Sequence, residues 1–92
     1  MNFVFEWDEN KAEKNKRIHK VSFDEAQTVF IDDFSIMKPD VEHSVSEERL
    51  IIIGTSNKNR VLVVSYTERW DNIRIISGRK ATRNERKQYE ED

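Results

Sequence analysis

Apolar residues are concentrated in short segments of this chain, and their spacing predicts its secondary structure. Three segments in the second half are rich in Ile, Val and Leu and bounded by polar residues, as strands are: 49–55, 60–67 and 72–78. The intervening residues 56–59 and 68–71 are short and turn-like. Because short connections join antiparallel neighbours, the second half is predicted to form a β-meander.

The chain begins with a predicted strand and helix. Residues 2–6 are apolar-rich and β-prone, and Asp8 follows them. The carboxylate of Asp8 is placed to accept the free amides of a first helical turn, which predicts a helix to about Ile18. Ala12 and Ile18 give this helix little apolar surface to bury, so we expect it to lie on the outside.

A second helix is predicted from a capping box. Ser22 and Glu25 have the spacing at which the hydroxyl and the carboxylate each satisfy a backbone amide of the other residue. Phe23, Ala26 and Phe30 then recur at positions i, i+3 and i+7. This spacing is typical of a helix face that packs on a core.

The remaining segments complete an α+β pattern. Residues 34–37 are predicted to form a brief strand, and residues 38–47, which hold the only Pro, a polar loop. Thr82 and Glu85 form a second capping box, which predicts a last helix ending near Tyr89. We therefore expect an α+β fold in which two N-terminal helices and a C-terminal helix pack on one antiparallel sheet.

Composition narrows the class of protein. The 92 residues contain one Pro and no linker-like stretch, so we expect a single domain over residues 1–92. The absence of Cys excludes disulfides, thiol catalysis and Cys-ligated zinc, and it fits a reducing cytoplasm. The first residues lack the pattern of a signal peptide. The longest apolar runs are only four residues, too short for a membrane span.

Charge is unevenly distributed along the chain. The formal net charge is -2, but residues 1–48 carry 6 Lys and Arg against 12 Asp and Glu, whereas residues 49–92 carry 10 against 6. A basic second half indicates binding to a polyanion, and the alternative is an ordinary solvated surface. Residues 69–87 hold five Arg and two Lys. This bias favours the polyanion, because the planar fork of Arg grips two phosphate oxygens.

Residues spread over the whole chain, in order and at characteristic spacing, carry a family resemblance. They are Phe5 to Asp8, Lys11, Ala12, Asn15, His19, Val21 to Ala26, Glu48, Arg49, Tyr66 to Arg69, Ile73 to Ser77, Arg79, Ala81, Thr82, Glu85, Arg86 and Tyr89. With this combination, the sequence resembles the BrnT family of bacterial toxins. Two positions depart from the family pattern: Lys20 stands where Gly is usual, and Gly78 where Ala is common. Lys20 would follow a helix end, where Gly suits a left-handed residue.

The resemblance implies a RelE-like fold and an endoribonuclease that arrests translation without a metal or cofactor. It also implies a cognate BrnA-like antitoxin. Toxin and antitoxin together would bind and repress their own promoter, so that DNA is contacted only through the complex. RNA would be the substrate.

Cleaving RNA without a metal requires a base for the 2′-hydroxyl, cations for the phosphorane, and an acid for the leaving oxygen. The candidate cations lie in one region of the sequence: Arg69, Arg74, Arg79, Arg83 and Arg86. The resemblance adds Ser77 as an RNA-binding residue. Tyr89 shares a helix face with Arg86, where it would either stack on a base or pack the helix onto the sheet.

Strand parity limits which of the arginines cooperate. On a regular strand Arg74 and Arg79 point to opposite faces, because successive side chains alternate. They converge only if a bulge interrupts the strand, and Gly78 is the expected place for one.

Two residues are candidates for proton transfer. Glu68, close to the arginines, is either a general base or acid, or the partner of Arg74 or Arg79 in a structural ion pair. Histidine is a natural proton shuttle near neutral pH, which makes His19 a candidate, although a cationic ring at a helix C-terminus also offsets the helix dipole. His43 is expected to be solvated in the polar loop. Two His without Cys do not indicate a metal site.

The preferred interpretation is a small endoribonuclease toxin in which Arg69, Arg74 and Arg79 bind the phosphate and Glu68 or His19 moves the proton. The alternative is a basic module on a RelE-like scaffold that binds nucleic acid or a partner without cleaving. In a third interpretation, the basic face serves chiefly to receive an acidic antitoxin segment.

Overall fold

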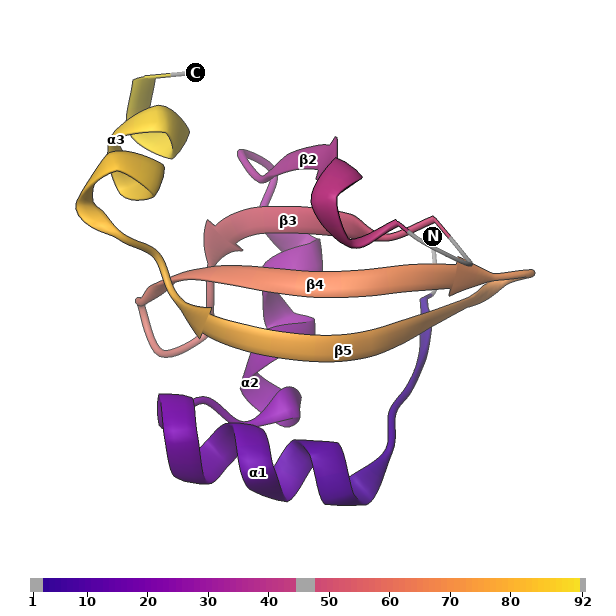
Figure 1. Cartoon of the computed structure of the whole chain (residues 1–92). Helices are drawn as coiled ribbons and strands as arrows, with labels where there is room; N and C mark the ends of the chain where they lie inside the picture. The colour runs from indigo at the N-terminus through magenta and orange to yellow at the C-terminus, as the bar shows by residue number, and fades with distance from the viewer. Residues whose placement is uncertain (1–2, 45–47, 92) are drawn as a thin grey trace.

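A computed structural model of the protein describes residues 3–44 and 48–91. Its centre is a five-stranded mixed sheet with strand order β1-β5-β4-β3-β2 (Figure 1). The elements in chain order are β1 (Val4–Glu6), α1 (Glu9–His19), α2 (Phe23–Ala26), the 3₁₀ turn η1 (Gln27–Ile31), β2 (Ile36–Pro39), the 3₁₀ turn η2 (Val41–His43), β3 (Leu50–Thr55), β4 (Val61–Arg69), β5 (Asn72–Lys80) and α3 (Arg83–Glu91). The α+β class predicted from the sequence is confirmed.

The meander of β3, β4 and β5 is antiparallel as predicted, but the sheet as a whole is not. Strand β1 lies parallel to the start of β5, with Phe5 opposite Ile73. Parallel neighbours cannot be joined by a tight turn and need a long crossover. Here the chain leaves β1 through α1 and α2, re-enters the sheet at its far edge in β2, and reaches β5 only after β3 and β4. The expectation of a purely antiparallel sheet was therefore wrong. Asn2, the first residue of the predicted strand, lies outside the described residues.

The predicted caps of the first two helices are present. Asp8 accepts hydrogen bonds from the amides of Asn10 and Lys11, at 2.8 and 3.1 Å. The Ser22 hydroxyl accepts the Glu25 amide at 3.1 Å, but the Glu25 carboxylate binds Ser56 and Arg60 instead of returning to Ser22, so the predicted capping box is only half formed. The second helix, however, is α-helical only to Ala26 and continues as η1.

This early end of α2 has a local cause. Thr28 donates its hydroxyl to the Glu25 carbonyl at 2.6 Å, and such side-chain bonds to the backbone compete with the α-helical pattern. The β-branched Val29 that follows also favours helix less than unbranched residues do. The predicted core stripe is confirmed nonetheless, since Phe23, Ala26 and Phe30 are all buried.

Strand β2 begins and ends two residues later than predicted, and the expected loop contains η2. Its Pro39 is tolerated because β2 is an edge strand, where one side of the ladder is unpaired. Residues 45–47 of the predicted loop lie outside the described part of the chain.

Helix α2 and the turn η1 cover one face of the sheet and form the core with it, and α1 runs along the β5 edge of the sheet (Figure 1). Phe30 is the centre of an aromatic cluster, with edge contacts to Phe5 and Tyr66 at centroid distances of 5.1 and 5.0 Å. The opposite face carries α3 at one end only (Figure 1). The remainder of that face is where the candidate site lies.

Candidate active site

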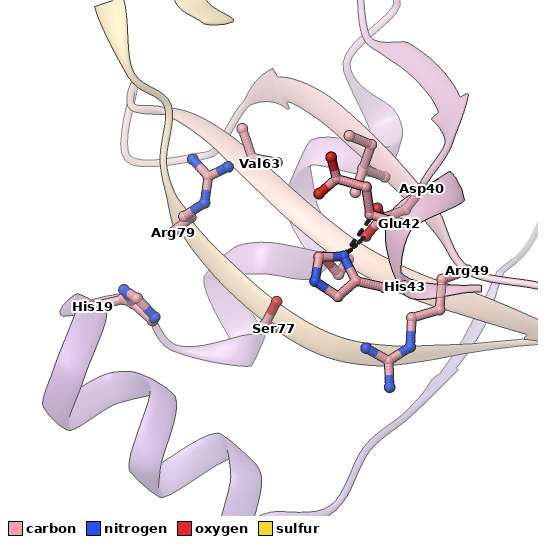
Figure 2. A pocket seen from close by; sticks show the side chains of 10 residues that line it. His19, Asp40, Glu42, His43, Arg49, Val63, Ser77 and Arg79 are labelled. Atoms are coloured by element: carbon pink, nitrogen blue, oxygen red, sulfur yellow. Dashed lines mark hydrogen bonds and ion pairs between the residues drawn. The ribbon is translucent and has the colours of Figure 1, made fainter. Parts of the chain in front are cut away.

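A groove of about 440 Å³ lies on this second face of the sheet (Figure 2). Side chains of the three meander strands form its floor: Ile51, Val63, Ser65, Ser77 and Arg79. Its walls come from the end of α1, from η2 with the residue before it, and from the residue before β3: His19, Asp40, Glu42, His43 and Arg49. The groove therefore combines two Arg, two His and two hydroxyls.

A β-bulge decides which side chains of β5 face the groove. Ser65 is paired with Ser77 but Tyr66 with Ile75, so that Ile76 is an extra residue. The bulge turns Ser77 and Arg79 onto the same face as Arg74. The predicted convergence of Arg74 and Arg79 on one face is thus confirmed.

The predicted position of the bulge was wrong. Gly78 lies in regular register opposite Val64 and faces the helices. A Cβ at this position would lie 3.3 Å from the Cβ of Ala26. Gly78 therefore serves the close approach of α2 to the sheet, a constraint that has nothing to do with strand regularity.

Arg79 is held by Glu85 in a two-point ion pair. Its Nη1 and Nη2 donate to the two carboxylate oxygens at 2.7 and 2.8 Å. The Arg79 guanidinium lowers the pKa of Glu85 to about 2. Glu85 also accepts the Thr82 amide at 2.8 Å, which confirms the predicted capping box. The start of α3 is thereby tied to the groove floor.

His19 reaches the groove from the end of α1. The helix stops there because Lys20 adopts a left-handed conformation, φ 61° and ψ 29°, and its amide donates to the Lys16 carbonyl at 3.0 Å. Figure 2 shows His19 beside the β5 residues Ser77 and Arg79. Three predicted site residues are therefore brought together in one place.

His43 is exposed to solvent, as expected, but the structure also places it in the wall of the groove. Its Nδ1 lies 2.9 and 3.0 Å from the two carboxylate oxygens of Asp40. The sequence signal for this pair is the i,i+3 spacing of Asp40 and His43, which one 3₁₀ turn brings together. Arg49, which lines the same wall, was noted only as part of the family resemblance.

Other predicted site residues lie away from the groove. Glu68 is paired with Ile73 on the helix-covered side of the sheet. Burial, and secondarily the Glu68 carboxylate, raises the pKa of Tyr66 on that same side to about 12. Arg74 faces the groove side but lies nearer the start of β5, outside the groove, where its guanidinium is 3.8 Å from the Glu6 carboxylate. Arg69 is the last residue of β4, opposite Asn72.

The C-terminal candidates lie on α3. Arg83 and Arg86 are exposed there and do not line the groove. The Tyr89 hydroxyl bonds to Asp32 and lies 2.9 Å from the Thr55 hydroxyl. Burial and the Asp32 bond raise the pKa of Tyr89. Tyr89 thus packs α3 onto the sheet, which was one of the two roles expected for it.

The sequence matches a known family over most of its length. Residues 7–85 match the profile described as "Ribonuclease toxin, BrnT, of type II toxin-antitoxin system". The chain belongs to the BrnT family of ribonuclease toxins. All ten groove residues fall within the matched range, whereas Arg86 and Tyr89 fall outside it.

A solved structure supports the fold. The crystal structure of the Brucella abortus ribonuclease toxin BrnT is similar with a TM-score of 0.68 and 21% sequence identity, over 89% of this chain and 100% of that one. At this identity the likeness shows the fold alone. No protein of curated function matches the sequence significantly.

Metal clusters and membrane-spanning helices are both absent from the part of the chain that the structure describes. In the described residues 3–44 and 48–91, no group of three His, Cys, Asp or Glu is arranged to hold a metal ion. Within the same residues, no helix is long and apolar enough to cross a membrane.

Proposed function

We propose that this BrnT-family chain is a cytoplasmic endoribonuclease that cleaves RNA in the groove without a metal, and that it thereby inhibits translation. We further propose that its scaffold is RelE-like. The observation that carries the proposal is the gathering of Arg79, Ser77 and His19, from β5 and α1, on one exposed face of the sheet. Together they supply a cation for the phosphate, a hydroxyl that can hydrogen-bond to it and an imidazole that can transfer a proton.

Arg79 is suited to hold the scissile phosphate even while it is bound to Glu85. Its contacts to Glu85 and to the Lys80 carbonyl use three of the five guanidinium N–H groups. The Nε–H and the outer Nη2–H form the second edge of the fork, which can bind two phosphate oxygens. Glu85 fixes the orientation of that edge before substrate arrives. Arg49, on the other side of the groove, adds positive charge.

His19 is assigned a proton transfer, and Ser77 a hydrogen bond to a phosphate or ribose oxygen. The imidazole is exposed at the groove edge, where substrate can reach it, and an imidazole can both accept and donate a proton. Glu68 receives no catalytic role in this proposal, because it is on the other side of the sheet. Arg69, Arg74, Arg83 and Arg86 are proposed to contact the RNA strand beyond the scissile phosphate.

The proposed partner is a cognate BrnA-like antitoxin. An antitoxin segment lying over the groove would cover Arg79 and His19 and so prevent RNA from entering. We propose that the complex, and not the free toxin, binds the promoter DNA and represses transcription.

The proposal is tested by incubating the purified protein, in excess EDTA, with labelled RNA that is either free or ribosome-bound. The wild-type protein is expected to cleave at least one of these two substrates, free RNA or ribosome-bound RNA. Arg79→Ala is expected to lower the rate by about 100-fold or more, since it removes a charge-stabilising fork. Lys87→Ala, which removes an exposed cation of α3, serves as the control and should cleave normally.

The alternative is a basic module that binds RNA without cleaving it, and the same experiment distinguishes it. RNA that is retarded in a gel but stays intact with the wild-type protein, free and on ribosomes, indicates a binding module. Thermal unfolding of Arg79→Ala must be measured alongside, because the variant also loses the Glu85 ion pair. Arg79→Lys, which keeps the charge but loses the fork, should be nearly as impaired.

A further inference from the structure

We propose that His43, oriented by Asp40, is the general base of the groove, and that His19 is the general acid. This inference rests on the proposed ribonuclease function and adds to it a second proton-transfer residue, drawn from a segment that sequence analysis expected to be a solvated loop. The supporting observations are the contact between His43 and Asp40 and the position of both residues in the wall of the groove.

The orientation of His43 follows from its contacts. The Nδ1 atom lies 2.9 and 3.0 Å from the two oxygens of the Asp40 carboxylate, so that Nδ1 carries the proton and points away from the substrate. Nε2 is then the free basic nitrogen. Figure 2 shows this nitrogen turned toward the side of the groove where Ser77 and Arg79 lie.

Asp40 is itself held in place, which a positioning residue requires. Its amide donates to the Arg49 carbonyl at 2.8 Å, and its carbonyl accepts the Ser44 hydroxyl at 2.8 Å. The Asp40 side chain is 18% exposed, whereas that of His43 is 60% exposed. The carboxylate is thus the sheltered anchor of the pair, and the imidazole is the part that substrate can reach.

The two imidazoles lie on opposite sides of the groove, with Ser77 of β5 between them (Figure 2). In-line displacement at phosphorus needs this arrangement, because the attacking and the leaving oxygens lie on opposite sides of the phosphorus atom. Nothing local in the sequence brings His19 and His43 together, since they come from α1 and η2.

In the proposed step one bond to phosphorus forms, one bond to phosphorus breaks, and two protons move. Nε2 of His43 takes the proton of the ribose 2′-hydroxyl, and the 2′-oxygen forms a bond to phosphorus. The bond from phosphorus to the 5′-oxygen of the next nucleotide breaks, and that oxygen takes a proton from the His19 imidazolium. The products are a 2′,3′-cyclic phosphate and a free 5′-hydroxyl, and no water is consumed.

The assignment of base and acid follows from the surroundings. The Asp40 carboxylate stabilises the imidazolium that forms when His43 accepts a proton, as in other Asp–His pairs. His19 lies in the last turn of α1, on the side of the groove opposite His43, where an in-line displacement places the leaving oxygen that an acid must protonate. The other charged groups that face His43 in the groove are Glu42, Arg49 and Arg79.

The test compares His43→Ala and Asp40→Asn with the wild-type protein in single-turnover cleavage across pH. His43→Ala is expected to lose about 100- to 1,000-fold in rate, together with the low-pH limb that reports deprotonation of the base. Free imidazole should restore part of that rate. Asp40→Asn should lose roughly 10-fold and move the low-pH limb to lower pH, an effect that a structural role alone would not produce.

Asp33→Asn is the matched control, because it removes an exposed turn carboxylate and should leave the profile unchanged. Circular dichroism establishes that each variant is folded. A substrate with a single 2′-deoxyribose at the cleavage position should be resistant, and the products should carry 2′,3′-cyclic phosphate ends.

Three results would overturn the inference while the ribonuclease function stands. They are normal cleavage by folded His43→Ala, an unmoved pH profile in Asp40→Asn, and cleavage of the 2′-deoxy substrate. If the wild-type protein cleaves neither free nor ribosome-bound RNA, the proposed function itself fails, and the two failures are thereby distinguished.

Discussion

Asn15 and Gly78 hydrogen-bond to each other in both directions. The Asn15 Nδ2 donates to the Gly78 carbonyl at 2.8 Å, and the Gly78 amide donates to the Asn15 Oδ1 at 3.1 Å. Strand β1 pairs with β5 only as far as Arg74, so Asn15 satisfies the strand edge beyond it. Since His19 is one turn further along α1, this contact determines where the imidazole meets the groove.

Asn15→Ala should therefore weaken both the fold and the activity. Asn15 is buried, and its loss leaves two groups of Gly78 and the Val21 carbonyl without their partner. We expect a loss of about 2–3 kcal/mol in the free energy of unfolding, measured by urea denaturation. RNA cleavage should also fall, because α1 no longer holds His19 in place. Asn10→Ala, at an exposed position of the same helix, is the control.

Lys20→Gly should stabilise the protein. Lys20 has φ 61°, a left-handed conformation that costs a residue with a Cβ roughly 1 kcal/mol and that Gly adopts freely. The expected gain is about 1 kcal/mol in the free energy of unfolding, less whatever the Lys20 Nζ contact to the Arg17 carbonyl contributes. Lys20→Ala separates the two effects, since it keeps the Cβ and loses the contact. A Gly variant no more stable than the Ala variant would contradict the argument.

Glu85→Gln should change how stability depends on pH. The pKa of the Glu85 carboxyl falls from its ordinary value of 4.5 to about 2 in the folded protein, mainly because of its hydrogen bonds to Arg79. A lowered carboxyl pKa adds stability that is present above pH 4.5 and is lost as the pH falls toward 2. We expect the variant to be less stable than wild type by about 1 kcal/mol at neutral pH, with the difference shrinking across that window. Urea melts at several pH values measure it.

Arg60→Ala should strongly lower the stability of the protein. Arg60 bonds the carboxylate of Glu25, which is only 3% exposed and also accepts the Ser56 hydroxyl at 2.7 Å. The Arg60 bond lowers the pKa of Glu25 and keeps it ionised inside the protein. Removing Arg60 leaves a buried charge without its partner, at a cost of roughly 3 kcal/mol.

Arg74→Ala provides the contrast for Arg60→Ala. The Arg74 guanidinium is 3.8 Å from the Glu6 carboxylate, and both side chains are partly exposed. We therefore expect Arg74→Ala to lower the free energy of unfolding by less than about 1 kcal/mol, measured by urea denaturation. Equal losses in the two variants would show that burial of Glu25 does not determine the cost.

The sequence by itself determined the features that depend on near neighbours. The caps at Asp8 and Ser22, the Thr82–Glu85 box and the i, i+3, i+7 stripe of the second helix all follow from spacing along the chain. So does the meander, because β-branched runs joined by short turns have few other ways to pair. Each of these involves residues close enough in sequence for local geometry to decide the contact.

Only the tertiary structure decided the site. The bulge at Ile76, which turns Arg79 to the groove, depends on the register with β4, and sequence alone placed it at Gly78. The position of His19 depends on the bond between Asn15 and Gly78, 63 residues apart. His43 entered the groove wall through its 3₁₀ turn with Asp40 and the pairing of that turn with Arg49. These contacts result from packing across the sheet, where residue spacing along the chain carries no information about distance.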